Sequence, residues 1–147
     1  MKVSKYMSTK LVTARPEMTV KEAFVLMATH HVRHIPVVEG GRLVGIISDR
    51  DLRRPRWADG LDDWTSYYRI SEEMTVRDVM TDKPEVLHTY DGIGKAVKIL
   101  REQRYGALPV LDKKEELAGI LSAHDLLGAL EEMLAGGAKA GGGKLEE

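Results

Sequence analysis

The sequence predicts an α/β (α+β) fold of two β-α-β-β-α repeats, related by a pseudo-twofold axis, with small sheets covered by helices. The first observation behind this prediction is a repeat. The stretch IPVVEGGRLVGIISDRDL at residues 35–52 returns as LPVLDKKEELAGILSAHDL at residues 108–126. The second is the pattern within each copy: an apolar segment, a polar turn and another apolar segment, which is typical of a strand, a hairpin and a second strand leading into a helix.

The duplication can be followed along most of the chain. Pro36 corresponds to Pro109 at a spacing of 73 residues, and Gly45 corresponds to Gly119 at a spacing of 74, so one residue is added in the turn between them. Further pairs at the first spacing are Met7 with Met80, Val20 with Ile93, Ala23 with Ala96 and Met27 with Leu100. A repeated unit of roughly fifty residues predicts two similar modules packed together.

In each unit we expect an extended piece before the first helix, at residues 11–14 and 85–88. The first helix begins at a capping box formed by Thr19 and Glu22 and ends before Pro36. Its counterpart starts at Asp91 or Gly92. The apolar faces are predicted to be Val20, Ala23, Phe24 and Met27 in the first helix, and Ile93, Ala96, Val97 and Leu100 in the second.

We divide the chain into a first repeat at residues 1–56, a linker at 57–75, a second repeat at 76–135 and a flexible Gly-rich tail at 136–147. The last helix is expected to continue to about Leu134. The linker contains Trp57, Trp64, Tyr67 and Tyr68. Rings this dense indicate a packed linker, which covers an open edge of the core or, alternatively, lies over a ligand or in a subunit contact.

The composition excludes several classes of function. There is no cysteine, which excludes disulfides, thiolate metal sites and cysteine nucleophiles. With 22 Lys and Arg against 23 Asp and Glu, the net charge of −1 gives no overall field to attract nucleic acid. No run approaches the ~18 apolar residues that span a membrane, and the N-terminus lacks the apolar segment of a secretory signal, so we expect a cytoplasmic protein.

The pairs Ser48 with Asp51 and Ser122 with Asp125 form the first candidate site. Each pair fits a helix N-cap, in which the serine accepts a hydrogen bond from the amide three residues on. Asp is shorter than the Glu or Gln that a reciprocal capping box prefers, and the pair recurs in both units. A helix N-terminus with a hydroxyl can also bind phosphate, and a carboxylate can accept from two ribose hydroxyls. The two interpretations are compatible.

Arg33 and His34, which follow His30 and His31, form a second candidate at the entrance to a strand. Arginine binds phosphate in a bidentate manner, and histidine does so when protonated. The second unit retains only Arg104 of this basic character, so the two units are chemically unequal. The alternative is a solvated helix end.

Neither a metal site nor catalysis is predicted. His30 and His34 have i,i+4 spacing, but no Asp, Glu or Cys nearby completes a zinc ligand set. Ser48 and Ser122 do not lie in a G-x-S-x-G elbow, and there is no P-loop or G-x-G-x-x-G motif. We therefore expect a protein that is not an enzyme.

At these residues the sequence resembles the cystathionine-beta-synthase (CBS) domain family, as a tandem pair that forms one Bateman module. The resemblance covers about residues 7–127 without the linker. It rests on the motifs MSTKLVTARPEMTVKEAFVLM, RHIPVVEGGRLVGIISDRDL, VRDVMTDKPEVL and GALPVLDKKEELAGILSAHDLL. Each motif is weak alone, but four in order and in duplicate are specific. The chain is most similar to small stand-alone CBS-pair proteins of bacteria and archaea.

The resemblance implies a regulatory module, usually a homodimer, whose clefts bind AMP, ADP, ATP or S-adenosylmethionine. It also implies roles for particular residues. Asp51 and Asp125 would take the ribose hydroxyls, with Ser48 and Ser122 near the phosphates. Phosphate contacts are also implied for Arg33 and His34, whereas Gly106 and Ala107 replace that pair in the second unit. The residues implied to lie against adenine are Val12, Thr13, Ile35, Pro36, Val86, Leu108 and Pro109.

We expect a sensor of adenine nucleotides that acts on an unidentified protein in trans. The phosphates would meet Arg33, His34 and Arg50, whereas the sulfonium of S-adenosylmethionine is a cation, so AMP, ADP or ATP is favoured. The main alternative is a dimerisation scaffold in which the Ser and Asp residues are only helix caps. An enzyme, and a DNA-binding role for residues 50–56, are less favoured.

Overall fold

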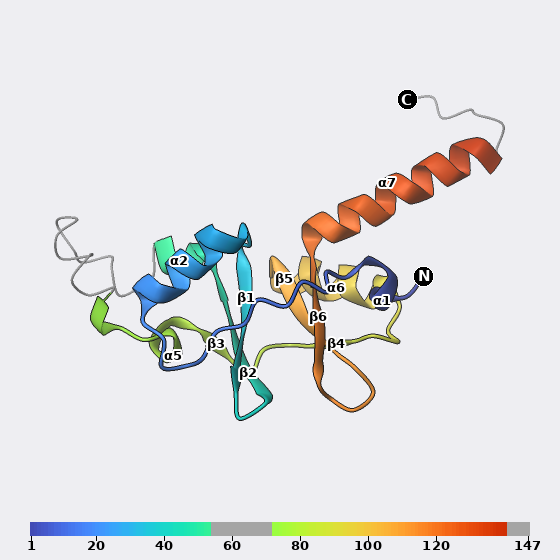
Figure 1. Cartoon of the computed structure of the whole chain (residues 1–147). Helices are drawn as coiled ribbons and strands as arrows, with labels where there is room; N and C mark the ends of the chain where they lie inside the picture. Colours follow the sequence, from blue (N-terminus) through green and yellow to red (C-terminus); the bar gives the residue numbers. More distant parts are fainter. Residues whose placement is uncertain (54–71, 141–147) are drawn as a thin grey trace.

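The computed structural model describes residues 1–53 and 72–140, which form two units side by side, each with its own core (Figure 1). The first unit contains α2 (Val20–His30), β1 (His34–Glu39), β2 (Arg42–Ser48) and α3 (Asp49–Arg53). The second contains β4 (Leu87–His88), α6 (Ile93–Gln103), β5 (Ala107–Leu111), β6 (Leu117–Ser122) and α7 (Ala123–Ala140). Short elements precede each run: α1 (Val3–Tyr6), α5 (Val76–Val79) and β3 (Thr81–Asp82). The predicted α+β class with two repeats is confirmed.

Each unit contains a three-stranded sheet. The strand orders are β1-β2-β3 and β4-β5-β6. The hairpins β1–β2 and β5–β6 are antiparallel, and β4 pairs with β5 in parallel. Of the predicted extended piece at residues 85–88, the last two residues form strand β4. The piece at residues 11–14 makes a single β-bridge, between Ala14 and Val37.

Helix α2 begins and ends as its sequence requires. The predicted capping box is confirmed: the Glu22 amide donates to Thr19 Oγ1 (3.0 Å), and the Thr19 amide donates to Glu22 Oε1 (3.3 Å). The helix ends at His31, which adopts a left-handed conformation (φ 54°). Of the predicted apolar face, Val20, Ala23 and Met27 are buried.

Two predicted core residues instead lie on the surface. Phe24 of α2 and Val97 of α6 are each 46% exposed. The buried stripe of each helix is narrower than the apolar pattern predicts, because each helix covers only a small sheet. Ala96 and Leu100 are buried as expected.

The beginning of each repeat packs against the other repeat. Val3 of α1 lies in the core of the second unit, and Val76 of α5 lies in the core of the first. The chain between α1 and α2 crosses from one unit to the other (Figure 1). Ser8 pairs with Ile120 of β6, and Thr81 pairs at the equivalent place with Ile46 of β2. The two units are therefore connected by backbone pairing at two places, Ser8 with Ile120 and Thr81 with Ile46.

Glycines make room for these crossings. A Cβ at Gly119 would lie 2.6 Å from the carbonyl oxygen of Ser8. A Cβ at Gly45 would lie 2.5 Å from Met80 Sδ and 2.9 Å from the carbonyl oxygen of Thr81. The repeated Gly of the two strands is therefore required by the close approach of a crossing backbone.

The last helix is longer than the sequence predicts. The sequence predicts an end near Leu134, but α7 continues to Ala140, so residues 136–140, which we assigned to the tail, are helical. Its Leu, Ala and Glu residues favour the helix strongly enough to carry it through Gly136. The helix projects away from the body of the molecule (Figure 1). The predicted aromatic linker lies almost entirely within residues 54–71, outside the described residues.

Candidate functional site

Both Ser-x-x-Asp pairs are reciprocal capping boxes. The Ser48 amide donates to Asp51 Oδ2 (2.9 Å), and the Asp51 amide donates to Ser48 Oγ (3.2 Å). The corresponding distances for Ser122 and Asp125 are 2.8 and 3.1 Å. Asp thus forms a reciprocal box in both units, although it is shorter than the Glu or Gln that such a box prefers. Since each box uses Oδ2, its second oxygen, Oδ1, takes part in neither bond.

Each box is held beside the start of a strand. The Asp49 amide donates to the carbonyl oxygen of Arg33 (2.8 Å), and the Ala123 amide donates to that of Gly106 (3.0 Å). These bonds place the N-terminus of α3 next to β1 and the N-terminus of α7 next to β5. The carboxylates are partly buried and face the space between the units.

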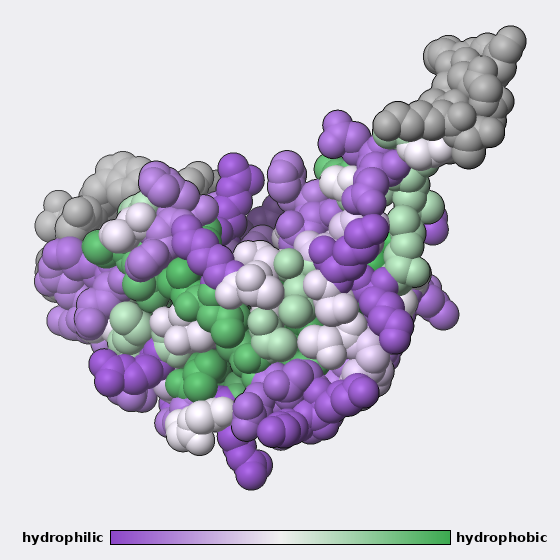
Figure 2. Space-filling model, turned by 45° about the vertical axis from the view of Figure 1, so that its right-hand side comes forward, coloured by the Kyte–Doolittle hydropathy of each residue, from purple (hydrophilic) through white to green (hydrophobic). Residues whose placement is uncertain are grey.

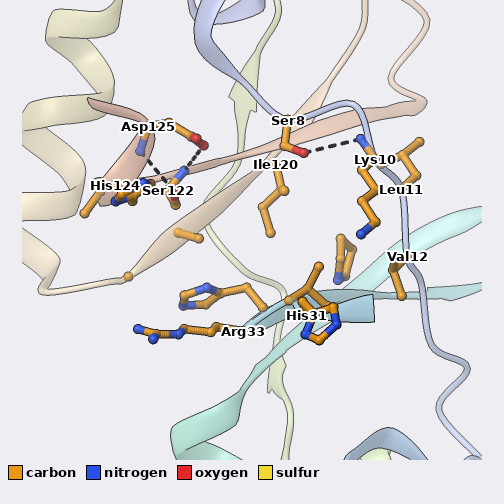
Figure 3. Close-up of a pocket in the computed structure, with 16 residues that line it drawn as sticks. Ser8, Lys10, Leu11, Val12, His31, Arg33, Ile120, Ser122, His124 and Asp125 are labelled. Carbon is orange, nitrogen blue, oxygen red and sulfur yellow. Dashed lines mark hydrogen bonds between the residues drawn. The ribbon is translucent and has the colours of Figure 1, made fainter. Parts of the chain in front are cut away.

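The Asp125 cleft lies between the units and has a volume of about 560 Å³. Six predicted site residues line it, namely Val12, Arg33, His34, Pro36, Ser122 and Asp125. Figure 3 shows Ser122, His124 and Asp125 on one side, with His31 and Arg33 across the space from them. The cleft therefore combines a carboxylate and hydroxyl from the second unit with basic groups from the first.

The Asp51 cleft lies at the equivalent place and has a volume of about 420 Å³. The predicted residues that line it are His34, Ser48, Arg50 and Asp51. Arg104 and Tyr105 take the places that His31 and Val32 occupy in the Asp125 cleft. The structure thus places the two predicted boxes in different clefts.

Several predicted adenine contacts do not reach either cleft. Ile35 and Leu108 lie in the two cores and are 0% and 1% exposed, and Pro109 lines neither cleft. A side chain without accessible surface cannot touch a ligand in this conformation. Thr13 and Val86 keep some exposed surface but line neither cleft. Strand alternation explains the first two, because Ile35 and Leu108 point from their strands into the sheets' buried faces.

Several residues that line the Asp125 cleft were not predicted from the sequence. These are Ser8, Lys10, Leu11, His31, Ile120 and His124, of which His31 had been noted only as a neighbour of the basic pair. Lys10 also holds the end of α2, since its Nζ donates to the carbonyl oxygen of His30 (2.8 Å). The one signal concerned Ser8, which follows Met7, a residue whose counterpart Met80 lies at the spacing of the repeat.

Burial changes the predicted role of His34. Its imidazole lies between the two clefts and is only partly exposed. Burial lowers the pKa of His34 below 6.5, and Arg33 acts in the same direction, while Asp49 and Asp51 oppose the shift. In the protein without ligand, burial therefore favours the neutral form of His34.

The described residues contain no cluster of three or more His, Asp or Glu side chains that could hold a metal ion. Within the same ranges, no helix combines the length and the apolar character needed to cross a bilayer.

The comparison with known sequences finds one family. The family model of the CBS domain matches residues 3–56 and 76–132. A CBS domain-containing protein of Dictyostelium discoideum is 32% identical over 137 residues, covering 90% of this chain and 92% of that protein. The inosine-5'-monophosphate dehydrogenase of Thermoplasma acidophilum is 32% identical over 115 residues, which are 78% of this chain but 21% of the enzyme.

Solved structures show the same arrangement of units. The CBS-pair protein CBSX2 from Arabidopsis thaliana superimposes with a TM-score of 0.78 at 26% identity, covering 91% of this chain and 96% of that one. CBSX2 in complex with AMP gives 0.73, also at 26% identity, with 90% and 97% covered. The CBS domain pair of protein MJ0100, in complex with 5'-methylthioadenosine and S-adenosyl-L-methionine, gives 0.76 at 21% identity, with 90% and 98% covered. The last similarity concerns the fold.

Proposed function

This chain belongs to the CBS domain family, and on this basis we propose that it is a non-catalytic regulatory module that binds AMP, ADP or ATP in the Asp125 cleft. Binding there would shift a partner protein between states, because a ligand that contacts both units favours one arrangement of them. Membership of the family supports the regulatory role, and the residues that line the cleft support the class of ligand.

One observation carries the proposal: a single cleft contains Asp125 with Ser122 on one side and Arg33 on the other. Asp125 Oδ1 takes part in neither capping bond and can accept from ribose hydroxyls. Arg33 can donate two hydrogen bonds to a phosphate. The volume of about 560 Å³ is within the range of ordinary small-molecule sites.

The charge of the cleft favours a phosphate-bearing ligand. Lys10 and Arg33 contribute cationic side chains, His31, His34 and His124 contribute imidazoles, and Asp125 is the single carboxylate among the residues that line the cleft. S-Adenosylmethionine is the alternative ligand. Its sulfonium is a cation and would lack a partner among the phosphate-binding groups. The AMP bound by CBSX2 supports the nucleotide, and the ligands of MJ0100 are a reason to test the alternative.

A thermal-shift screen tests the proposal. The wild-type protein is heated with AMP, ADP, ATP or S-adenosylmethionine, each at a few hundred micromolar. A ligand that binds only the folded state stabilises it by roughly 2.7 kcal/mol at a hundredfold excess over Kd. We expect a rise in Tm with at least one nucleotide that exceeds the rise with S-adenosylmethionine. A larger rise with S-adenosylmethionine would transfer the assignment to that ligand.

We further propose that the module acts as a homodimer and regulates a separate protein. Apolar side chains gather into a patch on one face, bordered by polar surface (Figure 2). Independently of that view, several apolar side chains are exposed on the helices, namely Phe24 and Val25 of α2, Val97 of α6, and Leu127, Leu130, Met133 and Leu134 of α7. A surface of this kind is typical of a protein–protein contact. Light scattering of the purified protein would give its mass in solution.

An interaction scaffold is the second candidate function. The observation in its favour is that the hydrogen bonds within both Ser-x-x-Asp pairs are satisfied without a ligand. The same thermal-shift screen separates the two functions. If no adenine compound raises Tm, the scaffold is supported and the nucleotide proposal fails.

A further inference from the structure

His34 is the one titratable side chain that lines both clefts among the described residues. It begins β1 and lies against Gly106, which precedes β5 in the other unit. A Cβ at Gly106 would lie 2.6 Å from His34 Nε2, so the imidazole occupies space that a side chain would otherwise fill. The ring thus forms part of the wall between the clefts.

Charged and other titratable side chains line the clefts on both sides of this ring. On the side of the Asp51 cleft they are Asp49, Arg50 and Asp51 of α3, with Arg104 and Tyr105 after α6. On the side of the Asp125 cleft they are Lys10 of the crossing segment, His31 and Arg33 before β1, and His124 and Asp125 of α7. Asp49 and Asp51 favour the protonated ring, and Arg33 disfavours it.

We propose that His34 makes the Asp125 cleft selective for phosphate-bearing ligands by taking up a proton as the phosphate enters. This inference rests on the proposed function. Protonation turns the imidazole into a cation with two N–H donors at the moment when an anion arrives beside it. A ligand without phosphate brings no anion that would stabilise the imidazolium.

The balance of charges explains why the proton moves on binding. Without ligand, burial disfavours the imidazolium, so His34 is neutral at pH 7.5. A phosphate dianion within hydrogen-bonding distance favours the imidazolium and raises its pKa. Binding of the phosphate and of the proton therefore strengthen each other, as linkage requires. AMP affinity should fall as pH rises above neutrality.

Calorimetry measures this proton directly. AMP is titrated into the wild-type protein at pH 7.5 in two buffers of different ionisation enthalpy, and the difference between the observed enthalpies gives the protons taken up per AMP. At this pH the phosphate of AMP is already a dianion, because its second pKa is about 6. We expect uptake of a proton with AMP. Adenosine, measured by competition against AMP, should bind without uptake.

The pH dependence gives a second readout that needs no variant. Between pH 7.0 and 8.5 the ratio of AMP affinity to adenosine affinity should fall, by at most about tenfold per pH unit for one linked proton. His34→Gln and His34→Asn should abolish both the uptake and this dependence. His124→Gln removes an exposed imidazole from the same cleft and tests whether that ring, rather than His34, takes up the proton.

The outcomes separate this inference from the proposed function. If wild-type protein does not bind AMP, the proposed function fails. If AMP binds but no proton is taken up, or if uptake is unchanged in His34→Gln and His34→Asn, the nucleotide proposal stands and the role of His34 is wrong. Uptake lost in His124→Gln and kept in the His34 variants would assign the proton to His124.

Discussion

Ser122 and Asp125, which line the larger cleft, are joined by two hydrogen bonds: the Ser122 amide donates to Asp125 Oδ2 (2.8 Å), and the Asp125 amide donates to Ser122 Oγ (3.1 Å). Ser48 and Asp51 repeat this arrangement in the smaller cleft. Since the two boxes have the same geometry but different surroundings, they allow the capping role to be separated from ligand binding.

The first prediction compares Asp125→Ala with Asp51→Ala. Each variant loses a capping box and should lower the free energy of unfolding by about 0.5–2 kcal/mol, measured by urea denaturation. AMP should raise the Tm of Asp51→Ala but not that of Asp125→Ala. If neither variant changes the response to AMP, Asp125 does not take the ribose.

The second prediction concerns the glycine beneath a crossing segment. Gly119→Ala places a Cβ 2.6 Å from the backbone oxygen of Ser8, which cannot move without breaking the Ser8–Ile120 pairing. We expect a loss of about 1–3 kcal/mol in the free energy of unfolding. Gly94→Ala is the matched control, since nothing lies within 4 Å of that Cβ in α6. The free energy of unfolding of Gly94→Ala should rise by about 0.5–1 kcal/mol.

The third prediction concerns Gly106, whose absent side chain leaves room for His34. In Gly106→Ala the new Cβ meets the far end of the imidazole, which can rotate away, so the free energy of unfolding should change little. AMP affinity should fall by up to about tenfold. This corresponds to the loss of one hydrogen bond to a charged group, which contributes about 1.5 kcal/mol. Unchanged affinity would show that the position of the ring is unimportant for binding.

The fourth prediction is a loss of stability in mild acid. The pKa of His34 is lowered by burial in the folded state, so the unfolded chain binds this proton more tightly. Stability therefore falls as the pH drops below about 6.5, the pKa of an exposed histidine. Between pH 7.5 and 5.5, the fall in Tm should be smaller in His34→Gln than in the wild type. An equal fall in both would assign the acid sensitivity to other groups.

The sequence predicted the fold through its duplication. Pro36 with Pro109, and Gly45 with Gly119, fixed two similar hairpins, and the capping box at Thr19 fixed the start of α2. The exchange of α1 and α5 between the units was not predicted. Each of these helices has four residues, which is too few for a periodic pattern. The core against which each helix packs is formed by residues far along the chain.

The candidate site was predicted in part. Arg33, His34, Ser122 and Asp125 were identified from residue type, and the structure brings them to one cleft. The half-buried position of His34 beside Gly106 could not be foreseen, because Gly106 belongs to the other unit. Ile35 was assigned to the site from the family resemblance, but the alternation of the strand turns its side chain into the core.

The most direct test of the account is calorimetric titration of AMP into the wild-type protein and Asp125→Asn, with Asp51→Asn as the matched control. Asn retains a hydrogen-bond acceptor for the capping box but removes the carboxylate charge and one acceptor oxygen. We predict that the wild type and Asp51→Asn bind AMP in the Asp125 cleft and that Asp125→Asn binds it at least about tenfold more weakly, the equivalent of 1.4 kcal/mol. Equal affinity in all three proteins, or no binding to the wild type, would contradict the assignment of this cleft as a nucleotide site.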